Sequence, residues 1–302
     1  MRPHQEVLTA PYAPPDFQTF WERTAWSHTS VSLNIERTHQ TLDDTSTHRV
    51  DRISFFGGGG KRIHGWFGVP KDEIPLFGGL LCLPVYGWEA QPIDFNSTLP
   101  GFATLSLNLH GYPPDYIRDY EYGDGYMARG IESRDSYIFR DITITALRAL
   151  DVLAEQVEVD NNRLVAGGMS QGGGLVFWLS ALTNRLKAVY ADMPFYADHR
   201  EYFRRQVRYP YKEIFDYIQT HPSTEVEIRQ TLAYYDTLNF APHTRCPVQV
   251  SYGKKDPKVR PIGVQSIYSA LPEPKNLIVY ENGHDWDPKM PENNLAWLKK
   301  IY

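Results

Sequence analysis

Short apolar runs alternate with longer amphipathic stretches over most of the chain. Six largely apolar runs of four to six residues lie at 80–85, 104–109, 163–166, 188–191, 248–252 and 277–280. Strands that read as continuous apolar runs are typical of sheets covered on both faces, and such sheets are mostly parallel. The pattern therefore predicts a buried, parallel central sheet.

Helices are predicted between these runs. One face of residues 137–157 repeats apolar residues every three or four positions, which is the spacing of a helix face. Its members are Ile142, Ala146, Leu150, Leu153 and Val157. Further helices are expected directly after Ser170, near 264–271 and at 293–301.

The first 70 residues follow other patterns. Residues 15–27 (PDFQTFWERTAWS) predict a short N-terminal helix that docks by its aromatic face. Residues 49–69 contain two β-rich runs joined by four glycines and Lys61, which predicts a hairpin. The glycines lack the GK[ST] ending and the following helix of a phosphate-binding loop, so we expect a flexible hairpin loop.

The alternation of strands and helices places the chain in the α/β class. It predicts a three-layer sandwich with a mostly parallel central sheet and the hairpin at one edge. Residues 195–240 interrupt the alternation, are rich in Tyr, Phe, Arg and His, and carry helical spacing, so we expect a helical, cap-like insertion. Without repeats or linkers, residues 1–302 are expected to form a single domain with this insertion.

Composition and charge exclude several classes of partner. The 302 residues carry a formal net charge of −5, with a pI near 6.1 and no run of Lys and Arg, which argues against nucleic acid and anionic membranes. No stretch approaches 18 apolar residues and no apolar signal-peptide centre is seen, so we expect a cytoplasmic protein. Cys82 and Cys246 are expected to pack as small apolar side chains.

Ser170 lies on a tight turn between a predicted strand and a predicted helix. Residues 168–172, Gly-Met-Ser-Gln-Gly, match the G-x-S-x-G nucleophile elbow in its strand–turn–helix setting. The glycines let strand and helix approach closely, and the backbone N–H of Gln171 at the helix N-terminus can face an oxyanion. Ser170 is the candidate nucleophile, with a helix-capping serine as the alternative.

A serine nucleophile needs a base, and the base needs an acid that fixes its tautomer. On this scaffold the partners follow the serine in the order Asp, His. Asp256 lies in the loop after the predicted strand at 248–252, and His284 in the loop after the strand at 277–280. Because active sites of open α/β sheets lie at the carboxyl ends of strands, Asp256 is the candidate acid and His284 the candidate base.

Some residues compete for these roles. His110 and His243 are alternative bases, and Asp192 and Asp285 are alternative acids. Asp256 before Pro257 is also an ordinary turn aspartate. Two clusters lack a recognised metal-ligand spacing, so we expect no metal ion. They are His284, Asp285 and Asp287, and Asp119, Glu121 and Asp124.

Several segments carry a resemblance to a known family. They are PPDFQTFWERT, KRIHGWFGVP, AGGMSQGGGL, ADMPFYADHREYFR and TLAYYDTLNFAPHTRCPVQVSYGKKD. Over nearly its whole length the chain resembles the acetyl xylan esterase and cephalosporin C deacetylase family of α/β-hydrolases (carbohydrate esterase family 7-like). The resemblance implies the α/β-hydrolase fold, the Ser170–His284–Asp256 triad and a homo-oligomer, in many members a hexamer. It also implies an oxyanion hole from the backbone N–H groups of Gln171 and Tyr86.

The chain departs from the family pattern near the expected substrate pocket. Pro84-Val85-Tyr86 stands where members carry His-Gly-Tyr, His110-Gly111-Tyr112 where they carry Arg-Gly-Gln, and Asp285 where Glu is common. We expect His110 and Tyr112 to lie at this pocket. Aromatic residues of the insertion, Phe195, Tyr196 and Tyr202, are expected to help wall it, with core or interface packing as the alternative.

The predicted function is that of a serine carboxylesterase. It would remove short acyl groups, acetyl first, from hydroxyls of a carbohydrate or similar small alcohol, without a cofactor. A peptidase or lactone hydrolase on the same scaffold is the first alternative. A non-catalytic binding protein that retains the elbow is the second, although binding alone does not require Asp256 and His284.

Overall fold

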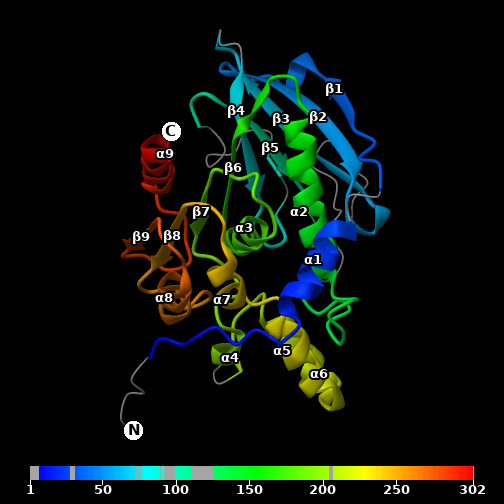
Figure 1. Cartoon of the computed structure of the whole chain (residues 1–302), viewed down its shortest axis with the longest axis vertical. Helices are drawn as coiled ribbons and strands as arrows, with labels where there is room; N and C mark the ends of the chain where they lie inside the picture. The colour runs from blue at the N-terminus through cyan, green and yellow to red at the C-terminus, as the bar shows by residue number, and fades with distance from the viewer. Residues whose placement is uncertain are drawn as a thin grey trace.

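A computed structural model of the chain describes residues 7–27, 31–72, 74, 76–88, 90–91, 99–109, 125–203 and 207–301. In these residues a nine-stranded sheet lies between layers of helices, in the order β1-β2-β3-β5-β4-β6-β7-β8-β9 (Figure 1). Strands β4 to β9 are parallel, while β1, β2 and β3 form an antiparallel edge that joins the parallel part through β3 and β5. The predicted α/β sandwich is confirmed.

The strands include the six that the apolar runs predict. Their bounds are β1 Glu36–His39, β2 His48–Phe56, β3 Arg62–Pro70, β4 Phe77–Leu83, β5 Phe102–Leu107, β6 Val159–Met169, β7 Ala188–Asp192, β8 Val248–Gly253 and β9 Lys275–Tyr280. β1 was not predicted, because its four residues ERTH are all polar and mostly exposed. It is held by its neighbour β2 and not by a buried face of its own.

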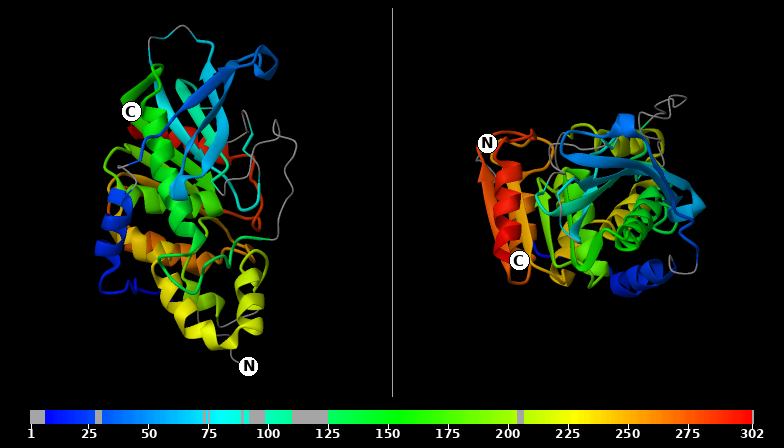
Figure 2. Two further views of the ribbon diagram at one scale, coloured as in Figure 1. Left: turned by 90° about the vertical axis from the view of Figure 1, so that its right-hand side faces the viewer. Right: turned by 90° about the horizontal axis from the view of Figure 1, so that it is seen from above.

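Helices cover both faces of the sheet. The main ones are α1 Phe17–Ser27, α2 Ile138–Ala154, α3 Gln171–Leu182, α8 Pro261–Ala270 and α9 Met290–Ile301. Leu80 and Cys82 of β4 belong to a cluster with Trp297 of α9, whereas Leu81 and Leu83 belong to the large core with α2 and α3. Successive strand residues thus enter opposite layers, which explains the continuous apolar runs. Figure 2 shows α9 and α2 on opposite sides of the sheet.

Two details differ from the sequence-based expectations. Helix α2 ends at Ala154, and Val157 lies beyond it with 84% of its surface exposed, because the chain turns there into β6. The glycine turn between β2 and β3 is also not a free loop. Gly58 donates its N–H to Thr145 Oγ1 at 2.8 Å, and a Cβ at this position would lie 2.3 Å from the carbonyl oxygen of Asp141. The turn therefore packs on α2, and only a residue without a side chain fits there.

The interruption at 195–240 folds as short helices at one end of the molecule (Figure 1). They are α4 His199–Tyr202, α5 Lys212–Thr220, α6 Glu225–Ala233 and α7 Thr237–Phe240, with 3-10 turns at Pro222–Thr224 and Ala241–His243. The N-terminal helix α1 docks beside them by its aromatic face, as predicted, with Phe17, Phe20 and Trp21 buried. These aromatic residues join those of α3 and the insertion in one core.

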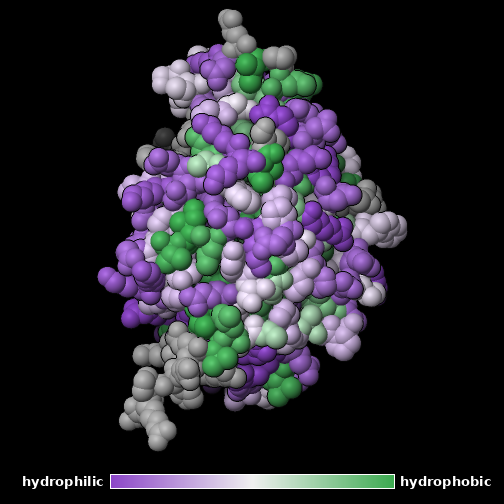
Figure 3. All heavy atoms as spheres, turned by 60° about the vertical axis from the view of Figure 1, so that its left-hand side comes forward, coloured by the Kyte–Doolittle hydropathy of each residue, from purple (hydrophilic) through white to green (hydrophobic). Residues whose placement is uncertain are grey.

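Polar side chains cover most of the molecular face shown in Figure 3, with small apolar patches between them. Within the described ranges, every helix is too short or too polar to cross a membrane.

Candidate active site

Ser170 connects β6 to α3 in a strained backbone conformation. Its φ of 54° and ψ of −116° lie in a region that residues with a side chain rarely adopt. Three backbone hydrogen bonds hold it there. The Ser170 N–H donates to the Asp192 carbonyl at 2.9 Å, and the Ser170 carbonyl accepts from Phe195 at 2.8 Å and Gly174 at 3.0 Å. The strain is thus balanced by the neighbouring strand and the first turn of α3.

The elbow glycines are required by close backbone contacts. A Cβ on Gly172 would lie 2.0 Å from the carbonyl oxygen of Leu83, and one on Gly168 would lie 2.7 Å from the carbonyl carbon of Gly172. Neither backbone atom can move aside as a flexible side chain would. The sequence pattern G-x-S-x-G therefore follows from how closely α3 approaches β4 and β6.

The structure brings Ser170, His284 and Asp256 together in one hydrogen-bonded relay. Ser170 Oγ lies 2.9 Å from His284 Nε2, and His284 Nδ1 lies 2.6 Å from Asp256 Oδ2. The other carboxylate oxygen, Oδ1, accepts from the backbone N–H groups of Lys258 and Val259, both at 2.8 Å. The Asp256 side chain is fully buried and that of His284 is 9% exposed. This arrangement can transfer a proton from the serine hydroxyl to the imidazole.

The alternative acids and bases that the structure describes, Asp192, Asp285 and His243, are not members of this relay. Asp192 accepts hydrogen bonds from Ser251 Oγ at 2.5 Å and Asn294 Nδ2 at 2.8 Å, and burial raises the pKa of Asp192 to about 6. Asp285 is exposed beside the relay. His243 contacts Gln18 of α1.

The proposed oxyanion residues flank the elbow. Tyr86 lies in the turn after β4, and Gln171 is the first residue of α3. β4 and β6 are neighbouring parallel strands in which Leu83 pairs with Gly168, so both strands end at the same edge. Helix N-termini present free N–H groups there.

A cavity of about 780 Å³ opens at this edge and reaches Ser170 and His284. Its walls come from the ends of β4, β5, β6 and β7, from the segments that follow β4, β8 and β9, and from Tyr209 and Pro210 of the insertion. Four aromatic lining residues were missed by the sequence analysis: Trp88, Tyr190, Tyr209 and Trp286. Trp88 and Tyr209 are 70% and 56% exposed. Position in the sequence could have indicated two of the four. Trp88 lies two residues after Tyr86, and Trp286 lies two residues after His284.

Phe195 and Tyr196 do not line this cavity, so their assignment to the substrate pocket was wrong. Both are 1% exposed. Phe195 packs on Tyr211 with ring centroids 4.2 Å apart, and Tyr196 meets Phe139 edge-on at 4.9 Å. The left-handed backbone at Tyr196 (φ 58°) accompanies the turn of this segment into the core. Tyr202 is likewise buried, against Tyr211. The positions of His110 and Tyr112 lie outside the described residues.

Among the described residues, no group of three or more His, Cys, Asp or Glu side chains is arranged to hold a metal ion. The three acidic residues Asp119, Glu121 and Asp124 lie outside those ranges.

Comparison with known proteins matches the family model "Acetyl xylan esterase (AXE1)" to residues 5–301. The chain belongs to the acetyl xylan esterase family. It is 26% identical over 320 residues to the acetyl esterase Axe7A of Xylanibacter ruminicola, an alignment that covers 97% of this chain and 69% of that protein.

Two solved structures share the fold over almost their whole length. An acetyl xylan esterase from a Paenibacillus species has a TM-score of 0.85 at 24% identity, and acetyl xylan esterase 1 from a Thermoanaerobacterium species has 0.84 at 25%. Each alignment covers 98% of this chain and 97% of the other. The protein is thus an ester hydrolase with the α/β-hydrolase fold.

Proposed function

We propose that this esterase removes acetyl groups from hydroxyls of a carbohydrate or similar small alcohol, with Ser170 as nucleophile. The observation that carries the proposal is the continuous relay from Ser170 Oγ through His284 to the buried Asp256. The acetyl group is favoured by the names of the family and of its relatives.

In the first half of the reaction, Ser170 Oγ attacks the ester carbonyl carbon while His284 Nε2 takes the hydroxyl proton. Asp256 accepts the hydrogen bond from Nδ1–H, which keeps Nε2 free as the base and stabilises the imidazolium. The tetrahedral intermediate then expels the alcohol, and His284 donates the proton to the leaving oxygen. An acetyl-enzyme remains on Ser170.

In the second half, His284 takes a proton from water as the water attacks the acetyl-enzyme. The bond to Ser170 Oγ breaks, the proton returns to the serine, and acetate leaves. In both halves negative charge develops on the carbonyl oxygen. The backbone N–H groups of Tyr86 and Gln171 are the proposed donors to it, and each such donor typically contributes about 10² to 10³ in rate.

The cavity favours a small, ring-shaped alcohol. A volume of about 780 Å³ lies within the range of small-molecule sites. Its aromatic lining residues Trp88, Tyr209 and Trp286 offer flat apolar faces beside polar groups. The family resemblance makes the acetyl group of cephalosporin C a further candidate substrate.

The test is hydrolysis of p-nitrophenyl acetate, butyrate and octanoate by the wild type, by Ser170→Ala and by the surface control Ser133→Ala. We expect acetate to be preferred, kcat of Ser170→Ala to fall about 10⁵- to 10⁶-fold, and the control to match the wild type. A preference for peptides or lactones over all three esters would favour the other hydrolase activities. Full activity of folded Ser170→Ala would exclude this serine as nucleophile.

The resemblance also supports a homo-oligomer, with a hexamer as its expected form. The expectation that Cys82 and Cys246 pack as apolar side chains, without forming a disulfide, favours a reducing compartment such as the cytoplasm. Light scattering of the purified chain measures its mass directly, against 34.8 kDa for one subunit. A monomer at micromolar concentration would contradict this part of the proposal.

A further inference from the structure

The hydroxyl of Tyr86 belongs to a hydrogen-bond network outside the catalytic relay. It donates to the Glu213 carboxylate, whose oxygens lie 2.8 and 2.9 Å away. It accepts from the backbone N–H groups of Tyr126 at 2.8 Å and Met127 at 3.1 Å, and the Met127 N–H also lies 2.9 Å from Glu213. Burial and then the charge of Glu213 raise the pKa of the Tyr86 hydroxyl well above its ordinary value, so it remains a donor. These contacts fix the Tyr86 side chain, and with it the turn after β4.

Tyr126 links the two segments that carry the proposed oxyanion donors. Its ring lies against that of Tyr86, with centroids 4.3 Å apart. Its hydroxyl donates to Gln171 Oε1 at 2.8 Å and accepts from the backbone N–H of Gly87 at 3.3 Å. Gly87 directly follows Tyr86. One buried phenol therefore connects the turn after β4 to the first residue of α3.

Glu213 reaches this network from helix α5 of the insertion. Its neighbours in the chain are anchored in the core: Tyr211 is 2% exposed and stacks on Tyr202 at 3.9 Å, and Ile214 is 1% exposed. Gly125 packs directly on the carboxylate, since a Cβ there would lie 2.1 Å from Glu213 Oε1. The position of the carboxylate is thus set by the backbone at Gly125 and by the N–H group of Met127.

We propose that Glu213 is a positioning residue that holds the Tyr86 backbone N–H in place for the oxyanion. The inference rests on the oxyanion donors of the proposed function. Glu213 is not among the residues that line the catalytic cavity, so it does not touch the substrate there. Donor placement matters most when charge develops on the carbonyl oxygen, so loss of Glu213 lowers kcat and leaves KM nearly unchanged.

The first experiment compares Glu213→Ala with Asp216→Asn. Asp216 lies on the same helix but is exposed and pairs with Lys212 one turn away. We expect kcat on p-nitrophenyl acetate to fall about 10- to 100-fold in Glu213→Ala, with KM within about twofold, and no change in Asp216→Asn. Glu213→Gln keeps one acceptor oxygen, so its kcat should fall less than that of Glu213→Ala. Inhibition by a trifluoromethyl ketone, which forms a tetrahedral adduct, weakens by the same factor as kcat falls.

Two further variants break the same contact without removing the Glu213 charge. Tyr86→Phe deletes the hydroxyl but retains the backbone N–H, and Gly125→Ala displaces the carboxylate. Both variants are expected to lower kcat as Glu213→Ala does. In the double variant of Tyr86→Phe and Glu213→Ala, kcat should fall no further than in either single variant, because the two side chains act as one unit. If Glu213→Ala fails to fold, these variants decide.

An unchanged kcat in folded Glu213→Ala, a raised KM at unchanged kcat, or additive losses in the double variant would each overturn the inference. Failure of the proposed function gives a different result, since the wild type itself would then not hydrolyse acetate or would do so without Ser170.

Discussion

At the scale of single residues, the site depends on a serine held in unfavourable backbone geometry. A conformation such as that of Ser170 costs on the order of 1–3 kcal/mol and persists only where neighbours enforce it. The bonds to Asp192, Phe195 and Gly174 provide that constraint. This backbone geometry directs the Ser170 hydroxyl toward His284, whose Nε2 lies 2.9 Å from it.

Asp256 is the residue whose role can be tested most directly. Asp256→Asn places an amide where the carboxylate accepts from His284 Nδ1, which disfavours the required tautomer, so kcat should fall about 10⁴-fold. Asp216→Asn is the matched control, because Asp216 is exposed on α5 and is not among the residues that line the cavity, and it should retain wild-type activity. Steady-state kinetics on p-nitrophenyl acetate check both. Comparable losses in the two variants would mean that Asp256 is not the acid.

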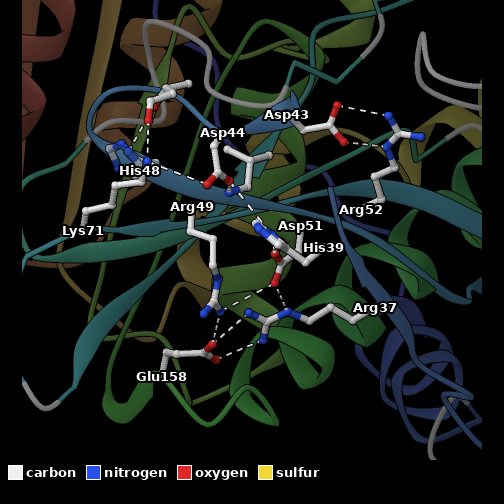
Figure 4. A network of polar contacts seen from close by, with 12 residues as sticks. Arg37, His39, Asp43, Asp44, His48, Arg49, Asp51, Arg52, Lys71 and Glu158 are labelled. Atoms are coloured by element: carbon white, nitrogen blue, oxygen red, sulfur yellow. Dashed lines mark hydrogen bonds and ion pairs between the residues drawn. The ribbon is translucent and has the colours of Figure 1, made fainter. Parts of the chain in front are cut away.

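At the scale of elements, an ionic network attaches the edge strand β1 to the body of the sheet (Figure 4). Arg37 of β1 donates to both oxygens of Glu158 at 2.8 and 3.0 Å and to Asp51 of β2 at 2.5 Å. Arg49 of β2 also donates to Glu158 at 2.5 Å. Glu158 lies just before β6, so the network joins segments more than a hundred residues apart. Charge pairing here replaces the buried apolar face that β1 lacks.

The network predicts a pH-dependent contribution to stability. Hydrogen bonds from Arg37 lower the pKa of Glu158 to about 2, below its unfolded value near 4.3. The contribution is therefore complete above about pH 4.3 and is lost as the pH falls toward 2. Glu158→Gln should reduce the free energy of unfolding at pH 7 by about 1–2 kcal/mol, after allowance for solvent screening, and by less at pH 2.5.

Urea unfolding at pH 7, 5 and 2.5 measures this difference, with the exposed neighbour Glu155→Gln as the control. A destabilisation of Glu158→Gln that is the same at every pH would show that the carboxylate charge is not its source.

At the scale of the whole molecule, the N-terminal helix, the sheet and the insertion share one aromatic core. Trp21 of α1 is 1% exposed and donates its indole N–H to the carbonyl of Tyr234 at 2.8 Å. Its ring meets those of Trp178 in α3, Tyr235 and Phe240, with centroids 5.2 to 6.1 Å apart. In the part of the chain that the structure describes, buried apolar side chains of α1 and of the insertion belong to the same core as those of the sheet.

This shared core predicts that α1 unfolds together with the rest of the chain. Trp21→Ala should lower the free energy of unfolding by about 3–5 kcal/mol, because it leaves a cavity and removes a buried hydrogen bond. The control Trp26→Ala, on the same helix but 77% exposed, should change it by less than about 0.5 kcal/mol. Circular dichroism and fluorescence give coincident transitions if the core is one unit. An early, separate transition in Trp21→Ala would show that α1 folds independently.

The sequence by itself determined the central strands, the elbow and the chain order of the relay. These features have local causes: a strand buried on both faces reads as an apolar run, and the approach of α3 to β4 excludes a side chain at Gly172. The positions of Asp256 and His284 follow from the rule that parallel strands end at one edge.

Only the tertiary structure decided which aromatic residues enter the core and which line the cavity. Phe195 and Tyr196 sit in irregular chain without a periodic signal, and their burial depends on Tyr211 and Phe139 from distant segments. The contact of Tyr86 with Glu213 joins residues 127 positions apart. Strand β1 likewise depends on partners outside itself. Such features arise from the proximity of segments far apart in the chain, which residue patterns within each segment do not encode.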